Sequence, residues 1–527
     1  MTDATSSADP ETSISRQQPG DDKRPRILDI AEGGGIVLIG GVLGRAIVFV
    51  YNLFLARAIG AEGLGLFTIG LAVATIASTL ALLGLNQGIV RFGAIYLTRD
   101  EKAKLKDTLV RSSIISLAAA IIVTLGLLAL APWLSSNAFD APYLAPVLAL
   151  LALTIPFAVV RGIFLATTRT FRVVWMLVLV DQLFLPLCLL VLTIALLALS
   201  LGLRGLAIAH IVSYALAAFL AYYLLSQLLP RSFRGRESGV PTAKLLRFSL
   251  PLSLGSLMHF TYERTETILL GVMSTVASVG IYNVALRTAN FETMFVQSLS
   301  VIFSPHIADL YERKAMAELE SLYKTTAQWS FTVGLAVFMI FVMFSEPILG
   351  MFGAEFKEGS TALVILGVGQ LVNAATGQAG YMLVMTGRSV LSLVNTIVLL
   401  VSSVILDVTL IPRYGLLGAA IAGSLAIMIF SVLRAAEVYH ILKMHPFKRA
   451  YWKPVVAGLV AISATSALRL VLPAGRHTLE LLLPLPVFLS LYVLLIYRLG
   501  LERDDKAVLL AIKNKIERLL PFPKKAM

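Results

Sequence analysis

The sequence predicts an all-α protein that crosses a membrane many times. Of its 527 residues, 57% are hydrophobic and only 14% are charged, and the mean hydropathy is +0.84. Soluble domains are about 45–50% apolar and about 25% charged, so most of this chain should be solvated by lipid. Apolar runs of about twenty residues, each long enough to cross a ~30 Å hydrocarbon core as a helix, recur to the end of the chain.

These apolar runs give about fourteen expected membrane helices. They lie at residues 34–56, 64–96, 108–131, 144–166, 173–200, 206–229, 246–273, 277–308, 322–349, 360–386, 389–411, 416–441, 452–472 and 478–498. The expected parts of the chain are a disordered cytoplasmic tail (1–33), an N-terminal six-helix bundle (34–229), a cytoplasmic linker (230–244), a C-terminal six-helix bundle (245–441), an extra helix pair (442–500) and a cytoplasmic amphipathic tail (501–527).

Loop charge sets the expected orientation of these helices. Lys and Arg concentrate in alternate loops, for example at Arg99 and Lys102, whereas the intervening loops hold few, for example Arg57. Basic loops favour the cytoplasmic side, so both termini should be cytoplasmic in a multi-pass protein of the cytoplasmic (inner) membrane. This distribution explains the net charge of +13 better than nucleic-acid binding does. The tail at 501–520 pairs an apolar face with basic residues, which suits a helix lying on an anionic leaflet or a solvated one.

The chain lacks the usual signatures of an enzyme. It has no phosphate-binding loop, no nucleophile elbow and no Cys/His spacing for a metal, and Cys188 is its only cysteine. No loop is large enough for a soluble catalytic domain, which weighs against a glycosyltransferase or a glycan polymerase. We therefore expect a protein without catalytic residues, cofactor or metal, driven by a gradient or by its own cargo.

An internal repeat predicts how the two bundles are related. Gly65-Leu66-Phe67 opens the second span, and Gly280-Ile281-Tyr282 opens the eighth; residues 202–209 likewise match residues 415–422. Each repeat holds six spans. Because that number is even, the halves keep one orientation, and their pseudo-two-fold axis should lie along the membrane normal.

The seventh span, within residues 244–271, carries ionisable groups near its middle. Such groups are costly in lipid and usually face a wet or protein-lined cavity. At helical spacing one stripe holds Ser256, His259, Tyr262, Glu263 and Glu266, with Arg264 to its side. Pro251 and Gly255 can bend the helix beside this stripe, as Gly40, Gly41 and Gly44 can in the first span. Helices that glycine or proline interrupts at equivalent positions of the two halves indicate either a transport site or close helix packing.

Polar residues on other spans complete the expected cavity. Arg45 and Asn52 lie on one face of the first span, and the remaining candidates are Asn283, Arg287, Asn290 and Gln297 on the eighth and Asn373 on the tenth. An isolated Asn or Gln more often makes a helix–helix hydrogen bond. A deep Arg favours a cavity lining, and its planar guanidinium suits phosphate, so we expect an anionic cargo. Glu292 points to the opposite face of the eighth span and is expected to pair with a neighbouring helix.

Acidic residues leave two interpretations open. Glu263 and Glu266 either balance the basic groups or titrate and couple transport to an ion gradient. Asp181 in the fifth span is a weaker candidate for ion coupling, because a structural hydrogen bond explains it as well.

Three stretches resemble a known family. Residues 54–75 (FLARAIGAEGLGLFTIGLAVAT), 385–401 and 410–426 are similar to polysaccharide-type (oligosaccharidyl-lipid) flippases of the MOP exporter superfamily, and the resemblance extends from about residue 30 to 500. It implies transport of an undecaprenyl-pyrophosphate-linked oligosaccharide repeat unit to the outer leaflet by alternating access, for O-antigen or exopolysaccharide assembly. It also implies glycan-assembly partners, namely a polymerase and glycosyltransferases, besides membrane lipids.

Rival interpretations remain. The plan also resembles lipid II flippases, which place arginines on spans 1, 2 and 8 of a cationic cavity; Arg45 and Arg287 lie on two of these spans. A cation-coupled exporter of small amphiphilic or drug-like molecules is a further alternative, in which Glu263 and Glu266 would be essential. A membrane scaffold for glycan assembly would leave the deep charges without a purpose.

Overall fold

The computed structural model describes residues 24–171, 173, 175–228, 239, 241–471 and 484–500. Within these ranges the regular elements are all helices, and eight of them are long and apolar enough to cross a membrane. The predicted class, an all-α polytopic membrane protein, is confirmed. Residues 1–23, most of the expected linker and the expected amphipathic tail at 501–527 lie outside the described residues.

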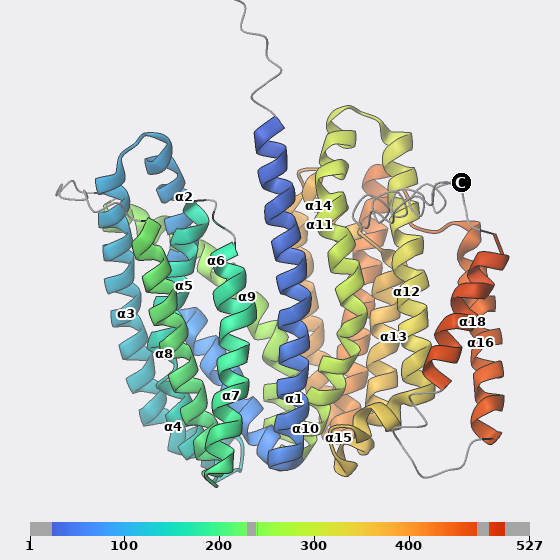
Figure 1. Ribbon diagram of the computed structural model, residues 1–527, viewed down its shortest axis with the longest axis horizontal. Coiled ribbons are helices and arrows are strands. Elements are labelled where there is room, and N and C mark those ends of the chain that lie inside the picture. Colours follow the sequence, from blue (N-terminus) through green and yellow to red (C-terminus); the bar gives the residue numbers. More distant parts are fainter. Residues whose placement is uncertain are drawn as a thin grey trace, which may run out of the picture.

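The first half of the chain forms one group of helices (Figure 1). Its α-helices are α1 (Arg24–Ala81), α2 (Leu85–Thr98), α3 (Lys102–Trp133), α4 (Leu144–Ala152), α5 (Ile155–Thr170), α6 (Trp175–Leu177), α7 (Leu185–Ala198) and α8 (Gly202–Leu228). Two π-helical turns, η1 (Leu134–Ala138) and η2 (Val178–Phe184), interrupt the series. Helix α1 begins ahead of the expected start at residue 34.

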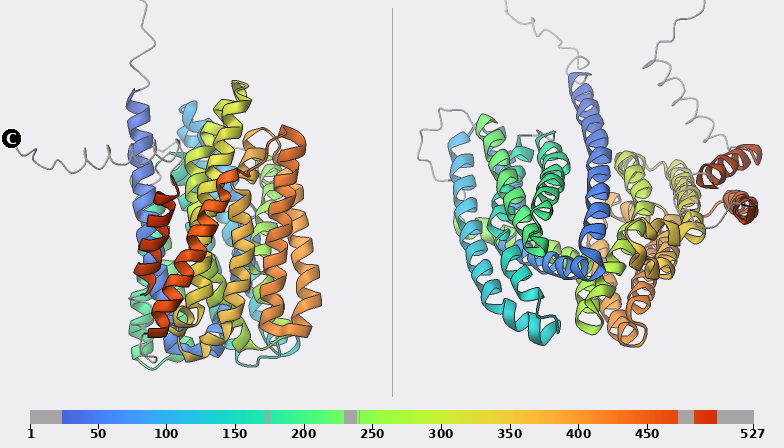
Figure 2. Two further views of the ribbon diagram at one scale, coloured as in Figure 1. Left: turned by 90° about the vertical axis from the view of Figure 1, so that its right-hand side faces the viewer. Right: turned by 60° about the horizontal axis from the view of Figure 1, so that its bottom comes forward.

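The second half forms the other group, and α1 lies between the two (Figures 1 and 2). Its α-helices are α9 (Thr242–Met273), α10 (Val276–Ala289), α11 (Phe291–Glu312), α12 (Met316–Gly350), α13 (Ser360–Thr376), α14 (Ala379–Met385), α15 (Ser389–Leu442), α16 (Trp452–Val471) and α18 (Pro484–Arg498). Short 3₁₀ turns, η3 (Ala354–Gly359) and η4 (Arg449–Tyr451), join some of them.

Two of the long helices are interrupted by glycine. Gly60 inside α1 has φ 68° and ψ −178°, and Gly415 inside α15 has φ 53° and ψ −126°. A side chain is strained at positive φ, so glycine suits both positions. Each break falls where the sequence predicts a turn between two spans.

The two halves meet through a glycine seam, which we define as Ala61, Gly65, Val276 and Gly280. A Cβ added at Gly65 would overlap the carbonyl oxygen of Val276, and one added at Gly280 would overlap the carbonyl oxygen of Ala61. The same offset of 215 residues relates Ala61 to Val276 and Gly65 to Gly280. The sequence repeat therefore converts one contact into the other. The contact is therefore self-complementary, as contacts across a two-fold axis are.

A buried apolar cluster surrounds the glycine seam. It combines residues of the first half, such as Leu64 and Phe67, with residues of the second, such as Val279 and Ile281. Where this apolar surface would otherwise meet water, its burial stabilises the contact between the halves by roughly 25 cal/mol per Å². In lipid the close backbone approach of small residues takes over that role.

Candidate functional site

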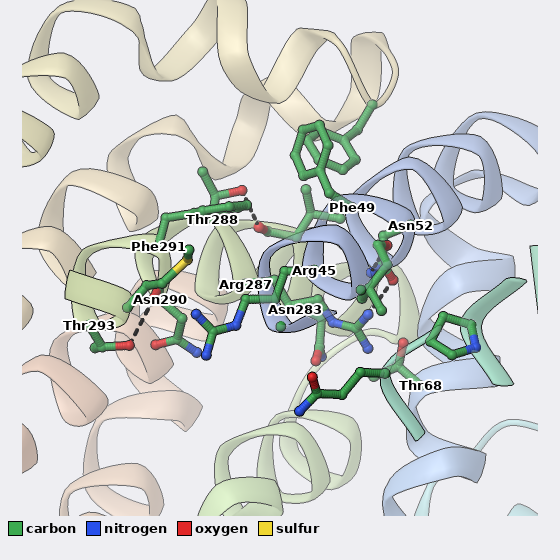
Figure 3. Close-up of a pocket in the computed structure, with 18 of the residues that line it drawn as sticks. Arg45, Phe49, Asn52, Thr68, Asn283, Arg287, Thr288, Asn290, Phe291 and Thr293 are labelled. Atoms are coloured by element: carbon green, nitrogen blue, oxygen red, sulfur yellow. Dashed lines mark hydrogen bonds between the residues drawn. The ribbon is translucent and has the colours of Figure 1, made fainter. Parts of the chain in front are cut away.

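A cavity of about 610 Å³ lies between the two halves. It is lined by α1 on both sides of the Gly60 break, the turn η2, Pro186 of α7, one residue of α9, the end of α10 and the start of α11, together with Phe352 (Figure 3). Most of its polar lining consists of arginine, amide and hydroxyl side chains. The cavity therefore collects the polar residues that the apolar spans would otherwise expose to lipid.

Three arginines from three helices line the cavity: Arg45 of α1, Arg264 of α9 and Arg287 of α10. The Arg287 guanidinium donates a hydrogen bond to Oδ1 of Asn52, and Figure 3 shows Arg45 and Arg287 in the same space. Among the described residues none of the three arginines has a carboxylate within ion-pair distance. Their positive charge is thus available to an anion that enters the cavity.

Amides surround these arginines. Asn52, Asn283, Asn290 and Gln297, all predicted from the sequence, line the cavity. Asn283 is buried and donates to the Val279 carbonyl at 2.9 Å, so packing already uses it. Asn290 caps the break between α10 and α11, and its Oδ1 accepts from the Gln370 amide at 3.3 Å.

One wall of the cavity is aromatic. Phe49 makes edge-to-face contacts with Phe291, at 5.7 Å between ring centroids, and with Phe352, at 5.9 Å. Phe291 is 45% exposed although it belongs to the interior between the halves. Sequence reasoning missed this wall; the available signal was that Phe49 is one turn from Arg45 and from Asn52 on the same helix.

The predicted stripe of the seventh span does not face the cavity. His259 and Glu263 are exposed, and Nε2 of His259 lies 3.5 Å from Oε1 of Glu263. The carboxylate of Glu266 accepts from the Tyr282 hydroxyl at 2.5 Å, against Gly423. The one α9 residue that lines the cavity is Arg264, which the helical spacing placed beside the stripe.

Two further predicted residues also have partners of their own. Asn373 lies outside the cavity lining, and its Oδ1 accepts from the Ser431 hydroxyl at 3.2 Å. Asp181 does line the cavity, but Arg161 of α5 donates to its carboxylate. Because that acid is already paired, the three cavity arginines keep a surplus of positive charge.

Comparison with known proteins decides the family. A family model described as "Polysaccharide biosynthesis protein" matches residues 30–311, more than half of the chain. The chain belongs to the polysaccharide biosynthesis protein family. The resemblance stated from the sequence is thereby confirmed.

A flippase of known name is similar to part of this chain. "Probable low-salt glycan biosynthesis flippase Agl15" of Haloferax volcanii is 26% identical over 190 residues, which are 36% of this chain and 40% of the relative. The match therefore spans two-fifths of that relative's length.

Solved structures share the fold. A lipid II flippase, MurJ, in an inward closed conformation gives a TM-score of 0.67 at 14% identity, over 87% of this chain and 97% of that chain. An inward-facing multidrug transporter of the MATE family, from the MOP superfamily, gives 0.63 at 17% identity, over 75% and 94%. At these identities the likeness establishes the fold.

The glycines of the first span have a packing role in this family member. A Cβ added at Gly44 would meet the backbone of Gln182 in η2, and one added at Gly40 would meet Val178. Helix α1 continues through both positions and breaks only at Gly60, and α9 continues through Pro251. Close packing of α1 on η2 therefore accounts for these glycines.

Proposed function

We propose that this protein is a flippase for a lipid-linked oligosaccharide. Its cargo would be an undecaprenyl-pyrophosphate-linked repeat unit, carried across the cytoplasmic membrane by alternating access for O-antigen or exopolysaccharide biosynthesis. The observation that carries the proposal is the group of three cavity arginines, Arg45, Arg264 and Arg287, with no carboxylate partner among the described residues. The similarity to a probable low-salt glycan biosynthesis flippase of Haloferax volcanii and the match to the polysaccharide biosynthesis family support the same class of cargo.

The pyrophosphate is the part of the cargo that the arginines recognise. A guanidinium keeps its charge, and its planar fork matches phosphate oxygens with two parallel hydrogen bonds. Each hydrogen bond to a charged group contributes about 1.5–3 kcal/mol. A cavity of about 610 Å³ is of the size that holds one drug-sized group. The prenyl tail would therefore stay in lipid between the helices.

The sugars would lie against the aromatic wall. The exposed ring of Phe291 offers an apolar face, and Asn52 and Asn290 offer amide donors and acceptors beside it. Specific pockets commonly combine such apolar faces with a few placed polar groups. His259, Glu263, Glu266 and Asn373, also predicted as cargo contacts, are outside this cavity and would act only in another conformation.

The membrane topology follows from the same helices. We infer fourteen spans in two six-helix bundles related by a pseudo-two-fold axis along the membrane normal, plus a C-terminal pair, with both termini in the cytoplasm. The glycine breaks in α1 and α15, each of which would separate two spans, support this count. The self-complementary glycine seam supports the axis. The protein would catalyse no covalent step and would work beside a polymerase and glycosyltransferases.

A cation-coupled exporter of small amphiphiles is the second candidate function. Glu266 is buried and lies within electrostatic reach of Asp407, which is buried on α15 and accepts from the Ser403 hydroxyl at 3.3 Å. By contrast Glu263 and Asp181 are each paired with a basic group. Of the three acids predicted to couple an ion, Glu266 is therefore the strongest candidate.

The decisive experiment uses liposomes. Purified protein is reconstituted with a defined prenyl-pyrophosphate glycan, and arrival of the glycan in the opposite leaflet is followed with a membrane-impermeant probe. Loss of one charged hydrogen bond of about 1.5–3 kcal/mol predicts that Arg287→Ala slows transfer by about 10–100-fold. Lipid II and a cationic dye are offered in parallel to test the alternatives.

The matched control is Arg413→Ala, which removes an exposed arginine of α15 outside the cavity and should transfer the glycan at the wild-type rate. Undiminished transfer by Arg287→Ala contradicts the proposal. Export of the dye alone, abolished by Glu266→Gln, would favour the second candidate.

A further inference from the structure

One acidic side chain of the structure has no role in the proposed cavity. Glu292 lies in the first turn of α11 and is 2% exposed. Neither of its carboxylate oxygens has a hydrogen-bond partner within the described part of the chain. The expectation that Glu292 pairs with a residue of a neighbouring helix is therefore wrong within the described part of the chain.

The space around Glu292 is built from small residues. A Cβ added at Gly334 of α12 would stand 2.8 Å from Oε1 of Glu292 and 2.9 Å from the Cβ of Ala374 on α13. Any larger residue at position 334 would displace the carboxyl group. The glycine thus makes room for a carboxyl group that has no hydrogen-bond partner among the described residues.

No cation faces this carboxyl group from the elements packed around it. Helix α13 has no charged residue, and the titratable group of α14 is Tyr381. On α12 the charged residues closest in sequence to Gly334 are Lys324 and Glu346, about 15 and 18 Å away at a rise of 1.5 Å per residue.

The helices on either side of the Glu292 turn supply no partner either. Arg287 of α10 is directed to Asn52 in the cavity. On α11 itself the next ionisable residues are His306 and Asp309, at least fourteen positions further on. A buried carboxylate without a partner is strongly disfavoured, so the neutral acid is the form that this conformation accommodates.

We propose that Glu292 is a proton-binding site that couples protonation to a movement of α11 beside the cavity. The protonated acid is buried between α11, α12 and α13. The ionised acid needs water, which requires α11 to separate from α12 and α13. On release the O–H bond breaks and the proton passes to water; on return a water-borne proton restores it, with no electron transferred.

The position of Glu292 connects such a movement to the cavity. Its neighbours Phe291 and Thr293 line the cavity on the other face of the same helical turn. Asn290, at the break between α10 and α11, is held by Gln370 of α13. Movement of the α11 turn would therefore shift the aromatic wall and the amides together.

The sign of the pH effect follows from the burial of the neutral form. Low pH should favour the conformation described here, and rising pH should favour the one in which Glu292 is hydrated. One proton exchanged in the transition changes the population ratio by up to about tenfold per pH unit. This holds whatever the cargo is, so the inference does not rest on the proposed function.

Spin-label distances test the inference without any cargo. Labels at Thr98 and Lys314 report on the α2–α3 and α11–α12 turns, which lie at the same end of the molecule in Figure 1. Cys188 is replaced by serine, and the distance distribution is measured in lipid nanodiscs from pH 5 to 9. The wild-type chain should shift from one distribution to another across this range.

Two neutral variants of similar size should abolish that shift. Glu292→Gln and Glu292→Met should keep the low-pH distribution throughout, whereas Gly334→Ala, which crowds the carboxyl group, should favour the high-pH distribution at every pH. Glu346→Gln, an exposed acid on α12, is the matched control and should shift like the wild type. A pH-independent wild type, or a wild-type shift retained in both Glu292 variants, overturns the inference.

Discussion

The interface between the two halves has two regions of opposite character. At the glycine seam the backbones of Gly65 and Gly280 touch, and apolar side chains surround them. At the cavity the same two halves present Arg45, Arg264 and Arg287 and stay apart. The two seam contacts are equivalent under the sequence repeat, but the cavity arginines are not, because Arg264 and Arg287 belong to the second half and Arg45 to the first.

The difference separates assembly from recognition. Symmetric small residues allow close approach and fix how the bundles dock, whereas asymmetric charges can bind a cargo whose two ends differ. Substitutions in the glycine seam should therefore affect folding, whereas substitutions of the cavity arginines should affect binding alone.

The largest expected effect is at the seam. Gly280→Val places a side chain on the Ala61 carbonyl and should destabilise the fold by about 3 kcal/mol or more, since overpacking alone costs about 1–3 kcal/mol. We expect aggregated protein by size-exclusion chromatography and a lowered thermal midpoint.

Gly255→Ala is the control for the seam variant. A Cβ at this helical glycine meets nothing within 4 Å, so stability should be unchanged or slightly raised. A Gly280→Val protein as stable as Gly255→Ala would show that the halves do not dock through these glycines.

An intermediate effect is expected in the cavity. Arg264→Ala should leave the thermal midpoint near the wild-type value but weaken binding of a prenyl-pyrophosphate analogue by about 10–100-fold, because one charged hydrogen bond is lost. Isothermal titration in detergent gives the affinity. Lys244→Ala, on the same helix outside the cavity, should bind normally; equal affinities for the two variants would remove Arg264 from the site.

The sequence revealed the arginines of the cavity more readily than its shape. Arg45 and Arg287 stand out because a deep charge in an apolar span needs a polar environment. The rotation of α9 could not be derived: Arg264, placed beside the predicted stripe, faces the cavity, while His259 and Glu263 pair outside it. A single helix fixes which residues share a face, not which neighbour that face meets.

Residues whose role depends on a neighbouring helix could not be recognised from the sequence. Phe49 and Phe291 look like any other aromatic residues of an apolar span, and only the meeting of α1 with α11 makes them a wall. That Glu292 lacks a hydrogen-bond partner in the described part of the chain likewise depends on how α12 and α13 pack against it. The repeat, by contrast, was visible in the sequence, and its offset of 215 residues relates Ala61 to Val276 and Gly65 to Gly280, the equivalent residues of the seam.

The smallest expected effect concerns a latch beside the seam, defined as Arg57, Ala61, Met351 and Glu355. The Ala61 N–H donates to the Glu355 carboxylate at 2.7 Å, and the Arg57 guanidinium donates to the Met351 carbonyl at 2.6 Å. Both bonds join the halves at the Gly60 break. The Arg57 bond is exposed and the Ala61 bond is only partly buried, so each should contribute about 1 kcal/mol.

Glu355→Ala tests the latch because it removes the acceptor while leaving the glycines intact. The population of the conformation described here should fall by about fivefold relative to its alternative, which 1 kcal/mol predicts. Spin labels at the exposed Tyr143 and Tyr414, one in each half, measure it. Glu358→Ala, three residues further on, should behave like the wild type, and an unchanged distribution in Glu355→Ala would show that the Ala61–Glu355 hydrogen bond does not hold this end closed.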